Sequence, residues 1–182
     1  MQFTRLDLPD VMLIEPSVFE DQRGFFLESY HKEQFAAAGL DADFVQDNHS
    51  GSRQGSLRGL HYQIRQPQGK LVRVIAGDAF DVAVDLRQAS PTFGRWVGAL
   101  LSADKKNQLW IPPGFAHGFY VLSTWAEVLY KATEYYAPQW ERSLLWNDPA
   151  LGIAWPLRAA EAPLLSEKDR TGVPLAGAEV YD

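Results

Sequence analysis

Two histidine-bearing motifs, with one lysine between them, hold the side chains best suited to chemistry. The first motif runs from Leu57 to Gln63 and contains His61, and the second spans residues 110–119 and contains His117. Lys70 lies between the two motifs. A neutral imidazole suits general base catalysis because its ordinary pKa lies near working pH. A lysine ammonium in the same pocket would repel a metal ion but would stabilise an oxyanion.

Each motif resembles one half of the signature of the cupin family. That signature places one histidine after a glycine on a strand and another in a Pro-x-Gly-x-x-His turn. A metal-binding cupin needs several imidazoles and a carboxylate around one ion, because the ligands must meet the ion's charge. Here Gln63 stands where the first half would carry its second histidine, and Lys70 stands where a ligand carboxylate would be expected. We therefore expect no metal ion, and we rank a metal-dependent cupin oxygenase last.

The length and composition predict a single domain over residues 1–182. The chain has 182 residues, 46% of them hydrophobic, which is ample for a core. It has no cysteine, which excludes disulfides, thiolate metal sites and cysteine nucleophiles. The net charge of −6 argues against a nucleic-acid partner. We see no run of about 18 apolar residues and no basic, apolar leader, so we expect a soluble, cytoplasmic protein without a membrane partner.

Strands must position most of these residues, since strand-like segments outnumber helix-like ones. Residues 79–86 alternate strictly, with Asp81 on the face opposite Phe80 and Val82, which predicts a half-buried strand. Eight further strands are predicted between turn signals, at residues 24–30, 44–50, 57–63, 70–75, 95–101, 108–111, 117–122 and 126–135. Helical character is confined to residues 31–38 and to two short turns, 148–151 and 166–170. The pattern therefore predicts an all-β antiparallel sandwich or barrel with a few short helices.

Seven separated motifs resemble those of the dTDP-4-dehydrorhamnose 3,5-epimerase family, whose members are metal-free, cupin-type jelly rolls. Each motif alone is weak, but their joint order and spacing are specific, and they extend over nearly the whole chain. They are DQRGFFLE at 21–28, FVQDNHS at 44–50, LRGLH at 57–61, GK at 69–70, WIPPGFAHGF at 110–119, YKATEYYAP at 130–138 and LSEKD at 165–169.

The resemblance implies a reaction that inverts both C3 and C5 of a 4-ketosugar nucleotide. dTDP-4-dehydro-6-deoxy-D-glucose would be converted to dTDP-4-dehydro-L-rhamnose through an enolate. The C4 carbonyl acidifies the hydrogens on both neighbouring carbons, so a base removes a proton from one face and an acid returns one to the other. The site must also place positive charge or hydrogen-bond donors at the C4 oxygen. No redox cofactor is needed.

The resemblance also assigns catalytic roles to four residues of this chain. His61 would be the base, and Asp169 would be the carboxylate that orients it, with Asp81 as the alternative for that role. Tyr130 would be the acid on the opposite face of the sugar. Lys70 would stabilise the enolate oxygen, although without the resemblance it reads equally well as a solvated turn residue.

Further residues are expected to bind the rest of the substrate. Arginine forks match phosphate oxygens, so Arg23 and Arg58 are candidates for the diphosphate, with Lys168 as a third cation. Tyr136 would stack on thymine, and His117 would lie near the sugar or phosphate. The resemblance adds four polar contacts at Glu28, Gln46, Asn48 and Glu141.

Members of the family are homodimers in which an N-terminal segment of one subunit completes the other's site, so Arg23 and Glu28 are expected to act in trans. Two alternatives stay open. A related enzyme on the same scaffold could invert C3 or C5 alone, or move the keto group between C3 and C4, with most nucleotide contacts retained. A non-catalytic sugar-binding jelly roll would not need His61, Tyr130 and Lys70 together.

Overall fold

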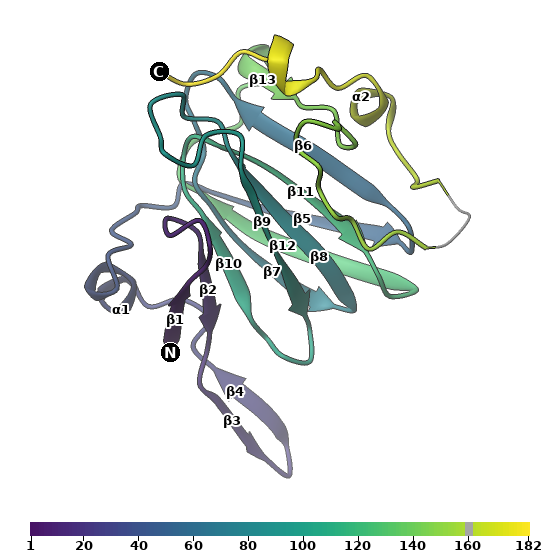
Figure 1. The fold of residues 1–182 in the computed structure, drawn as a ribbon. Helices are drawn as coiled ribbons and strands as arrows, with labels where there is room; N and C mark the ends of the chain where they lie inside the picture. The colour runs from purple at the N-terminus through teal and green to yellow at the C-terminus, as the bar shows by residue number, and fades with distance from the viewer. Residues whose placement is uncertain (159–161) are drawn as a thin grey trace.

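Two antiparallel sheets pack face to face in the computed structural model, which describes residues 1–158 and 162–182 (Figure 1). The six-stranded sheet has the order β1 (Gln2–Arg5), β2 (Met12–Glu15), β10 (Gln108–Ile111), β7 (Lys70–Ala76), β12 (Trp125–Ala132) and β5 (Gln46–Arg53). The five-stranded sheet has the order β13 (Glu141–Ser143), β6 (Leu57–Gln63), β11 (Phe115–Val121), β8 (Asp78–Asp85) and β9 (Trp96–Ser102). The predicted all-β jelly-roll class is confirmed.

The remaining elements are short. A separate hairpin joins β3 (Val18–Asp21) to β4 (Gly24–Leu27), and the described residues include two α-helices, α1 (Lys32–Ala37) and α2 (Glu167–Arg170). Single 3₁₀ turns occur at Pro138–Trp140 and Leu175–Gly177. In the part of the chain that the structure describes, no helix has the length and apolar character that a membrane span requires.

Small and aliphatic side chains fill the space between the sheets. Val72 and Val128 from the six-stranded sheet pack in one buried cluster with Ala83 and Val121 from the five-stranded sheet. A second cluster lies around α1, where Phe35 packs with residues of β2, β7 and β10. Burying such side chains stabilises the fold by roughly 1.5–3 kcal/mol each.

Strand β8 is buried on both faces, which corrects the prediction of a half-buried strand. The alternation was right, because Ala79 and Ala83 face the space between the sheets. The opposite face carries Val82 and Val84, which pack in a third cluster with residues of the C-terminal segment such as Trp155. The C-terminal segment therefore covers the apolar face of β8, and the six-stranded sheet covers the face with Ala79 and Ala83, which a half-buried strand would expose.

The structure also differs from the sequence-based elements at several boundaries. β1, β2, β3 and β13 were not predicted, and each has only three or four residues, although β4 and β10, which are equally short, fell within predicted strands. The predicted strand at residues 126–135 ends at Ala132 in β12. Residues 148–151 form a hydrogen-bonded turn instead of a helix, in which the backbone N–H of Leu151 donates to Asp148.

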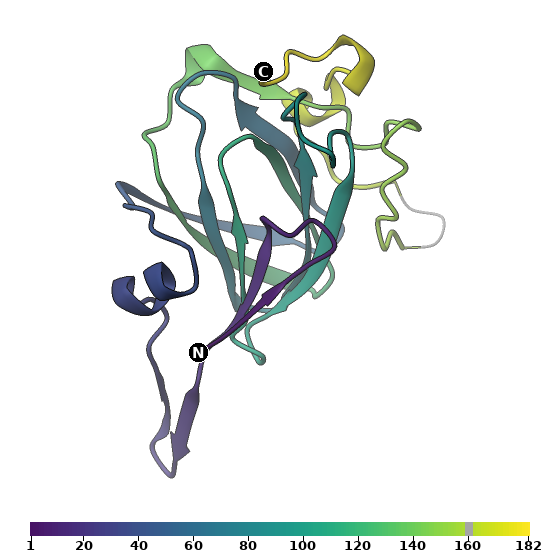
Figure 2. The ribbon, with the colours of Figure 1, turned by 60° about the vertical axis from the view of Figure 1, so that its left-hand side comes forward.

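The β3–β4 hairpin projects from one end of the molecule, whereas β13 and α2 lie at the opposite end (Figure 1). The view in Figure 2 shows the same hairpin extending away from the two sheets, with α1 beside its base. Its exposed side chains include three phenylalanines, Phe19, Phe25 and Phe26, whose exposed fractions are 65%, 61% and 67%. This hairpin makes an apolar projection with no covering element in the described chain.

Candidate active site

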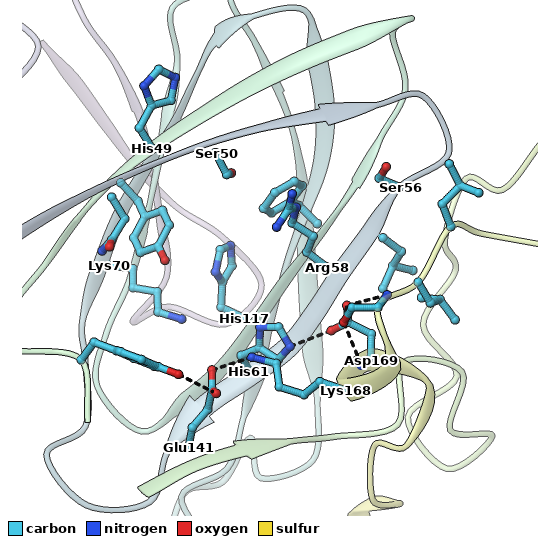
Figure 3. Close-up of a pocket in the computed structure, with 18 residues that line it drawn as sticks. His49, Ser50, Ser56, Arg58, His61, Lys70, His117, Glu141, Lys168 and Asp169 are labelled. Carbon is cyan, nitrogen blue, oxygen red and sulfur yellow. Dashed lines mark hydrogen bonds and ion pairs between the residues drawn. The ribbon is translucent and has the colours of Figure 1, made fainter. Parts of the chain in front are cut away.

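A cavity of about 630 Å³ lies between the sheets at the end that carries β13 and α2. Figure 3 shows side chains from both sheets and from α2 lining it. β6 and β11 supply His61 and His117, whereas β7 and β12 supply Lys70 and Tyr130. α2 adds Asp169 and its neighbour Lys168. A ligand in this cavity would therefore lie between the two sheets.

An irregularity in β6 brings Arg58 and His61 to the same wall. His61 pairs with His117 of β11, but Arg58 pairs with Phe119, so three residue steps on β6 match two on β11. In a regular strand, residues three apart point to opposite faces; the extra residue of a bulge restores the phase. Gly59 lies within this bulge with φ of +115°, and a Cβ there would lie 2.5 Å from the Cα of Gly118. Glycine is the residue that this close approach permits.

His61 and Asp169 form a hydrogen-bonded pair at the base of the cavity. Nε2 of His61 lies 2.7 Å from Oδ1 of Asp169, whose side chain is only 3% exposed. The same Oδ1 accepts from the backbone N–H of Gly59 at 3.1 Å. The other oxygen, Oδ2, accepts from the hydroxyl of Ser166 at 2.5 Å. The carboxylate is thus held from three sides, and Nδ1 of His61 has no hydrogen-bond partner among the described residues.

The surroundings set the ionisation of this pair. Burial lowers the pKa of His61, and the charges of Lys168 and Lys70 lower it further, against the opposing effect of Asp169. Burial opposes ionisation of Asp169, but hydrogen bonds from His61, Ser166 and Gly59 outweigh it and bring the pKa of that carboxyl to about 2. Near neutral pH, the pair is therefore a neutral imidazole beside a carboxylate.

Asp81 does not orient His61, so this alternative is wrong. Its two carboxylate oxygens each lie 3.0 Å from Nε2 of His117, and both side chains are buried. The pairing follows from the register, since Asp81 on β8 and His117 on β11 lie on the cavity side of neighbouring strands. The cavity is therefore lined by two histidines, each paired with an aspartate, and the His61 pair is the more exposed of the two.

Lys70 and Tyr130 face these histidines from the six-stranded sheet. In the sheet register Tyr130 lies beside Val72, and Lys70 lies beside Ala132, so both side chains share one face. The ammonium of Lys70 lies 5.9 Å from the centre of the Tyr130 ring. Burial lowers the pKa of Lys70 to about 8, although Asp81 and Glu141 favour its charged form. Burial also raises the pKa of Tyr130, so its hydroxyl keeps its proton at neutral pH.

Tyr136, Glu141 and Lys168 form a polar chain across the mouth of the cavity. The hydroxyl of Tyr136 donates to Glu141 at 3.0 Å, and the ammonium of Lys168 donates to the same carboxylate at 2.8 Å. Burial opposes ionisation of Glu141, but the bond and charge of Lys168 prevail and lower the pKa of that carboxyl. The ring of Tyr136 is half exposed and could take an aromatic base on its face.

Gln46, Asn48 and Arg58 occupy the neighbouring part of the site. The amide of Gln46 donates to Asn48 at 2.9 Å, and its oxygen accepts from the backbone N–H of Tyr136 at 2.9 Å. Asn48 lines the cavity, and Gln46 therefore supports it from the same strand. The Nε of Arg58 donates to the hydroxyl of Ser52 at 2.9 Å.

The side chain of Gln63 does not line the cavity and instead forms hydrogen bonds with the backbone. Its amide nitrogen donates to the carbonyls of Gln66 and Tyr135, and its oxygen accepts from the backbone N–H of Ala137. It thereby ties β6 to the segment that carries Tyr136. Among residues 1–158 and 162–182, no three His, Cys, Asp or Glu side chains converge as a metal-binding set.

Arg23 and Glu28 are the two predicted binding residues that lie away from the cavity of their own chain. Arg23 is on the β3–β4 hairpin, where its guanidinium forms an exposed ion pair with Asp21 at 2.6 Å. Glu28 follows β4, and its nearest hydrogen-bond partner is Gln34 in the segment of α1. Neither residue lines the cavity of its own chain.

Sequence reasoning missed the residues that hold the others in place. Ser166 was part of a segment that resembled an ordinary helix start, and it does cap α2, but it also holds the carboxylate of Asp169. The reciprocal Ser166–Asp169 capping pattern was a readable signal. Gly59 and Ser52 gave no such signal, because their partners are distant in sequence or on the other sheet.

Comparison with known proteins places these features in context. The family model described as dTDP-4-dehydrorhamnose 3,5-epimerase matches residues 5–177. The chain is 62% identical over 182 residues to the dTDP-4-dehydrorhamnose 3,5-epimerase of Pseudomonas aeruginosa, which covers 100% of this chain and 99% of that protein.

The solved structures similar to this chain include two with a bound nucleotide sugar. The epimerase of Legionella pneumophila in complex with dTDP-4-keto-L-rhamnose is 50% identical with a TM-score of 0.94, covering 98% of this chain and 94% of that one. A 3'-monoepimerase from Streptomyces bikiniensis in complex with dTDP-quinovose is 36% identical with a TM-score of 0.87, covering 94% and 86%.

Proposed function

This chain belongs to the dTDP-4-dehydrorhamnose 3,5-epimerase family, and from that premise we propose how its site performs the reaction. The protein is an epimerase. It inverts C3 and C5 of dTDP-4-dehydro-6-deoxy-D-glucose and forms dTDP-4-dehydro-L-rhamnose. The observation that carries the assignment of residues is the His61–Asp169 pair at 2.7 Å on one wall of the cavity. Tyr130 and Lys70 lie on the other wall.

Proton abstraction falls to His61. With the proton of Nε2 donated to Asp169, the lone pair of Nδ1 is free to take a proton from C3 or C5. The C–H electron pair then moves into the ring and the C4 carbonyl becomes an enolate. The charge that appears on the imidazole is stabilised by the carboxylate of Asp169, which stays ionised.

Lys70 supplies the positive charge for the enolate oxygen. Its pKa of about 8 leaves the ammonium mainly protonated at neutral pH, and its burial keeps water from screening it. His117, held by Asp81, is placed to contact the sugar beside it. A buried cation with no ion-pair partner among the described residues is suited to a charge that the substrate develops.

Tyr130 returns the proton from the opposite face. It lies on the sheet that faces His61, and its raised pKa keeps its proton available at neutral pH. Delivery to the same carbon from the face opposite the abstraction gives inversion. His61 then releases its proton to water and Tyr130 regains one from water, and the same cycle at the second carbon completes the double epimerisation without a cofactor.

The nucleotide half is held by Arg58, the Tyr136–Glu141–Lys168 chain and Asn48, with Gln46 behind it. Arg58 is the diphosphate contact within the chain, and Tyr136 stacks on thymine. The exposed hairpin supplies Arg23 and Glu28 to the cavity of a second copy in a homodimer. The exposed phenylalanines of that hairpin support this arrangement, because isolated apolar projections of this kind mark association surfaces.

Isotope exchange tests the reaction directly. The ketosugar nucleotide incubated with the enzyme in D2O should acquire deuterium at both C3 and C5 together with inversion at both centres, as read by NMR. Label at C3 or C5 alone would identify a mono-epimerase. The absence of any label would contradict the catalytic assignment and favour a binding protein.

The two substitutions His61→Asn and Tyr130→Phe separate the base from the acid. His61→Asn lacks a basic nitrogen, so exchange and epimerisation should both fall by about 10²–10⁴-fold. Tyr130→Phe leaves the base intact, so His61 can form the enolate and return a deuteron to the same face. Exchange should therefore outrun inversion in Tyr130→Phe. Epimerisation at the wild-type rate by that variant, or normal exchange by His61→Asn, would show that the roles are wrongly assigned.

A further inference from the structure

We propose that Ser52 is a positioning residue that fixes one edge of the Arg58 guanidinium, so that the other edge is presented to the diphosphate. The inference rests on the proposed function, since it takes Arg58 to be the diphosphate contact. It assigns to Ser52 a part in substrate affinity through Arg58.

The contacts join the two sheets. Arg58 extends from β6, and Ser52 lies on β5 at the edge of the opposite sheet. The Nε of Arg58 donates to the hydroxyl oxygen of Ser52 at 2.9 Å, and Nη2 donates to the carbonyl of Gly51 at 3.3 Å. Ser52 is 5% exposed, so its hydroxyl has little access to water as an alternative partner. Arg58 lines the cavity shown in Figure 3.

The N–H donors of the Arg58 guanidinium show which of its edges stays available to the diphosphate. A guanidinium has five N–H groups in a fixed fork, one on Nε and two on each Nη. Nε and Nη2 form the side edge, which Ser52 and Gly51 occupy. The end edge keeps one N–H group of Nη1 and the second one of Nη2, and the other N–H of Nη1 points to the Cδ side. This edge has the spacing to bind two phosphate oxygens in parallel.

The two oxygens that accept hydrogen bonds from Arg58 carry no charge, and this matters for binding as much as their positions do. Ser52 and Gly51 offer neutral oxygens, and no carboxylate among residues 1–158 and 162–182 forms an ion pair with Arg58. Arg23 and Arg87, by contrast, have their side edges on Asp21 and Asp85. A neutral anchor orders the side chain without neutralising the charge that a diphosphate needs. Ordering the side chain in the free protein also removes an entropy cost that binding would otherwise carry.

Affinity for dTDP, measured by calorimetry on the full-length protein, provides the test as a double-mutant cycle. Ser52→Ala should raise the Kd by about 3- to 10-fold, the effect expected for one hydrogen bond that orders a charged partner. Ser52→Thr keeps a hydroxyl on a residue suited to a strand and should restore most of the affinity. In an Arg58→Ala background, Ser52→Ala should change the Kd by less than about twofold, since its effect passes through Arg58.

The outcomes separate this inference from the function it rests on. If Arg58→Ala leaves the Kd for dTDP unchanged, Arg58 is not the diphosphate contact, and both the clamp and the role of Ser52 are wrong. If Arg58→Ala weakens binding, but Ser52→Ala raises the Kd for dTDP by the same factor with and without Arg58, only the role of Ser52 is wrong. An unchanged Kd for Ser52→Ala alone would have the same meaning. Thermal unfolding of each variant identifies a loss of affinity that comes from a damaged fold.

Discussion

Burial lowers the pKa of both His61 and Lys70, and the two shifts have opposite effects on the pH range in which the enzyme can act. A base must be unprotonated before it acts, so a lowered pKa keeps His61 ready over a wider range of pH. The lysine at the enolate oxygen must stay protonated, so a lowered pKa narrows the pH range in which Lys70 carries its charge. Burial in the cavity thus extends the pH range of activity on the acid side and shortens it on the alkaline side.

The pH dependence of kcat/KM should therefore be bell-shaped. Activity should rise as His61 loses its proton, with a midpoint below its ordinary value of 6.5, and should fall as Lys70 loses its proton near pH 8. Lys70→Arg keeps the charge and removes this titration, because arginine stays protonated above pH 12. A pH–rate profile of that variant should keep the acid limb and lose the alkaline limb. An alkaline limb that stays near pH 8 would show that another group controls it.

The irregularity in β6 is the element that aligns the site. It places Arg58 and His61 on one wall although they are three residues apart, and it directs the N–H of Gly59 at Asp169. The diphosphate contact and the base thus depend on the same short stretch of backbone. A change that regularised this stretch would turn one of the two side chains away from the cavity.

Gly59→Ala tests this dependence, with Gly55→Ala as a matched control. Both glycines have positive φ, +115° and +79°, but a Cβ at Gly59 would meet the backbone of Gly118 at 2.5 Å, whereas Gly55 has nothing nearer than 3.9 Å. Gly55→Ala should cost about 1–2 kcal/mol of unfolding free energy from its backbone conformation alone. Gly59→Ala adds the collision and should cost about 2–5 kcal/mol. Urea unfolding measures both.

Activity distinguishes the two glycines further. Gly59→Ala should lower kcat/KM in the fraction that remains folded, because Arg58 and His61 lose their common wall. Gly55→Ala should keep activity in proportion to its folded fraction. Equal losses of stability in the two variants, with activity retained in both, would mean that the β6 irregularity does not align the site.

The sequence predicted most strands and the order of the motifs, but long-range pairing decided the rest. Alternation identified β8 and put Asp81 on the correct face, yet its partner His117 depends on the register between β8 and β11. The burial of the face with Ala79 and Ala83 depends on the opposite sheet, which no local pattern of β8 could show. Asp169 came from the family motif, because its distance of 108 residues from His61 leaves no local signal.

The shape of the whole molecule separates the cavity from the β3–β4 hairpin. The hairpin projects from the end opposite α2 and β13 (Figure 1). Residues of α2 and β13 line the cavity, whereas the hairpin carries three exposed phenylalanines. A single chain therefore leaves Arg23 outside its own site and an apolar surface in water. Pairing two copies would bury that surface and bring each Arg23 to the partner's cavity, as a self-complementary dimer allows.

Complementation between two inactive variants tests this arrangement. Arg23→Ala keeps His61 but lacks the hairpin arginine, and His61→Asn keeps Arg23 but lacks the base. If Arg23 acts in trans, a mixed dimer contains one site with both residues intact, formed by the cavity of the first variant and the hairpin of the second. Unfolding the two variants together and refolding them should restore roughly a quarter of wild-type activity, since about half of the dimers are mixed and each has one intact site.

Each variant refolded alone is the matched control and should stay inactive. If Arg23 acts in cis, both sites of the mixed dimer lack one residue, and no activity returns. Size measurement of the refolded mixture establishes that dimers have formed, and a tag on one variant allows the mixed species to be isolated. Mixed dimers that form but remain inactive would rule out a contribution of Arg23 to the partner's cavity.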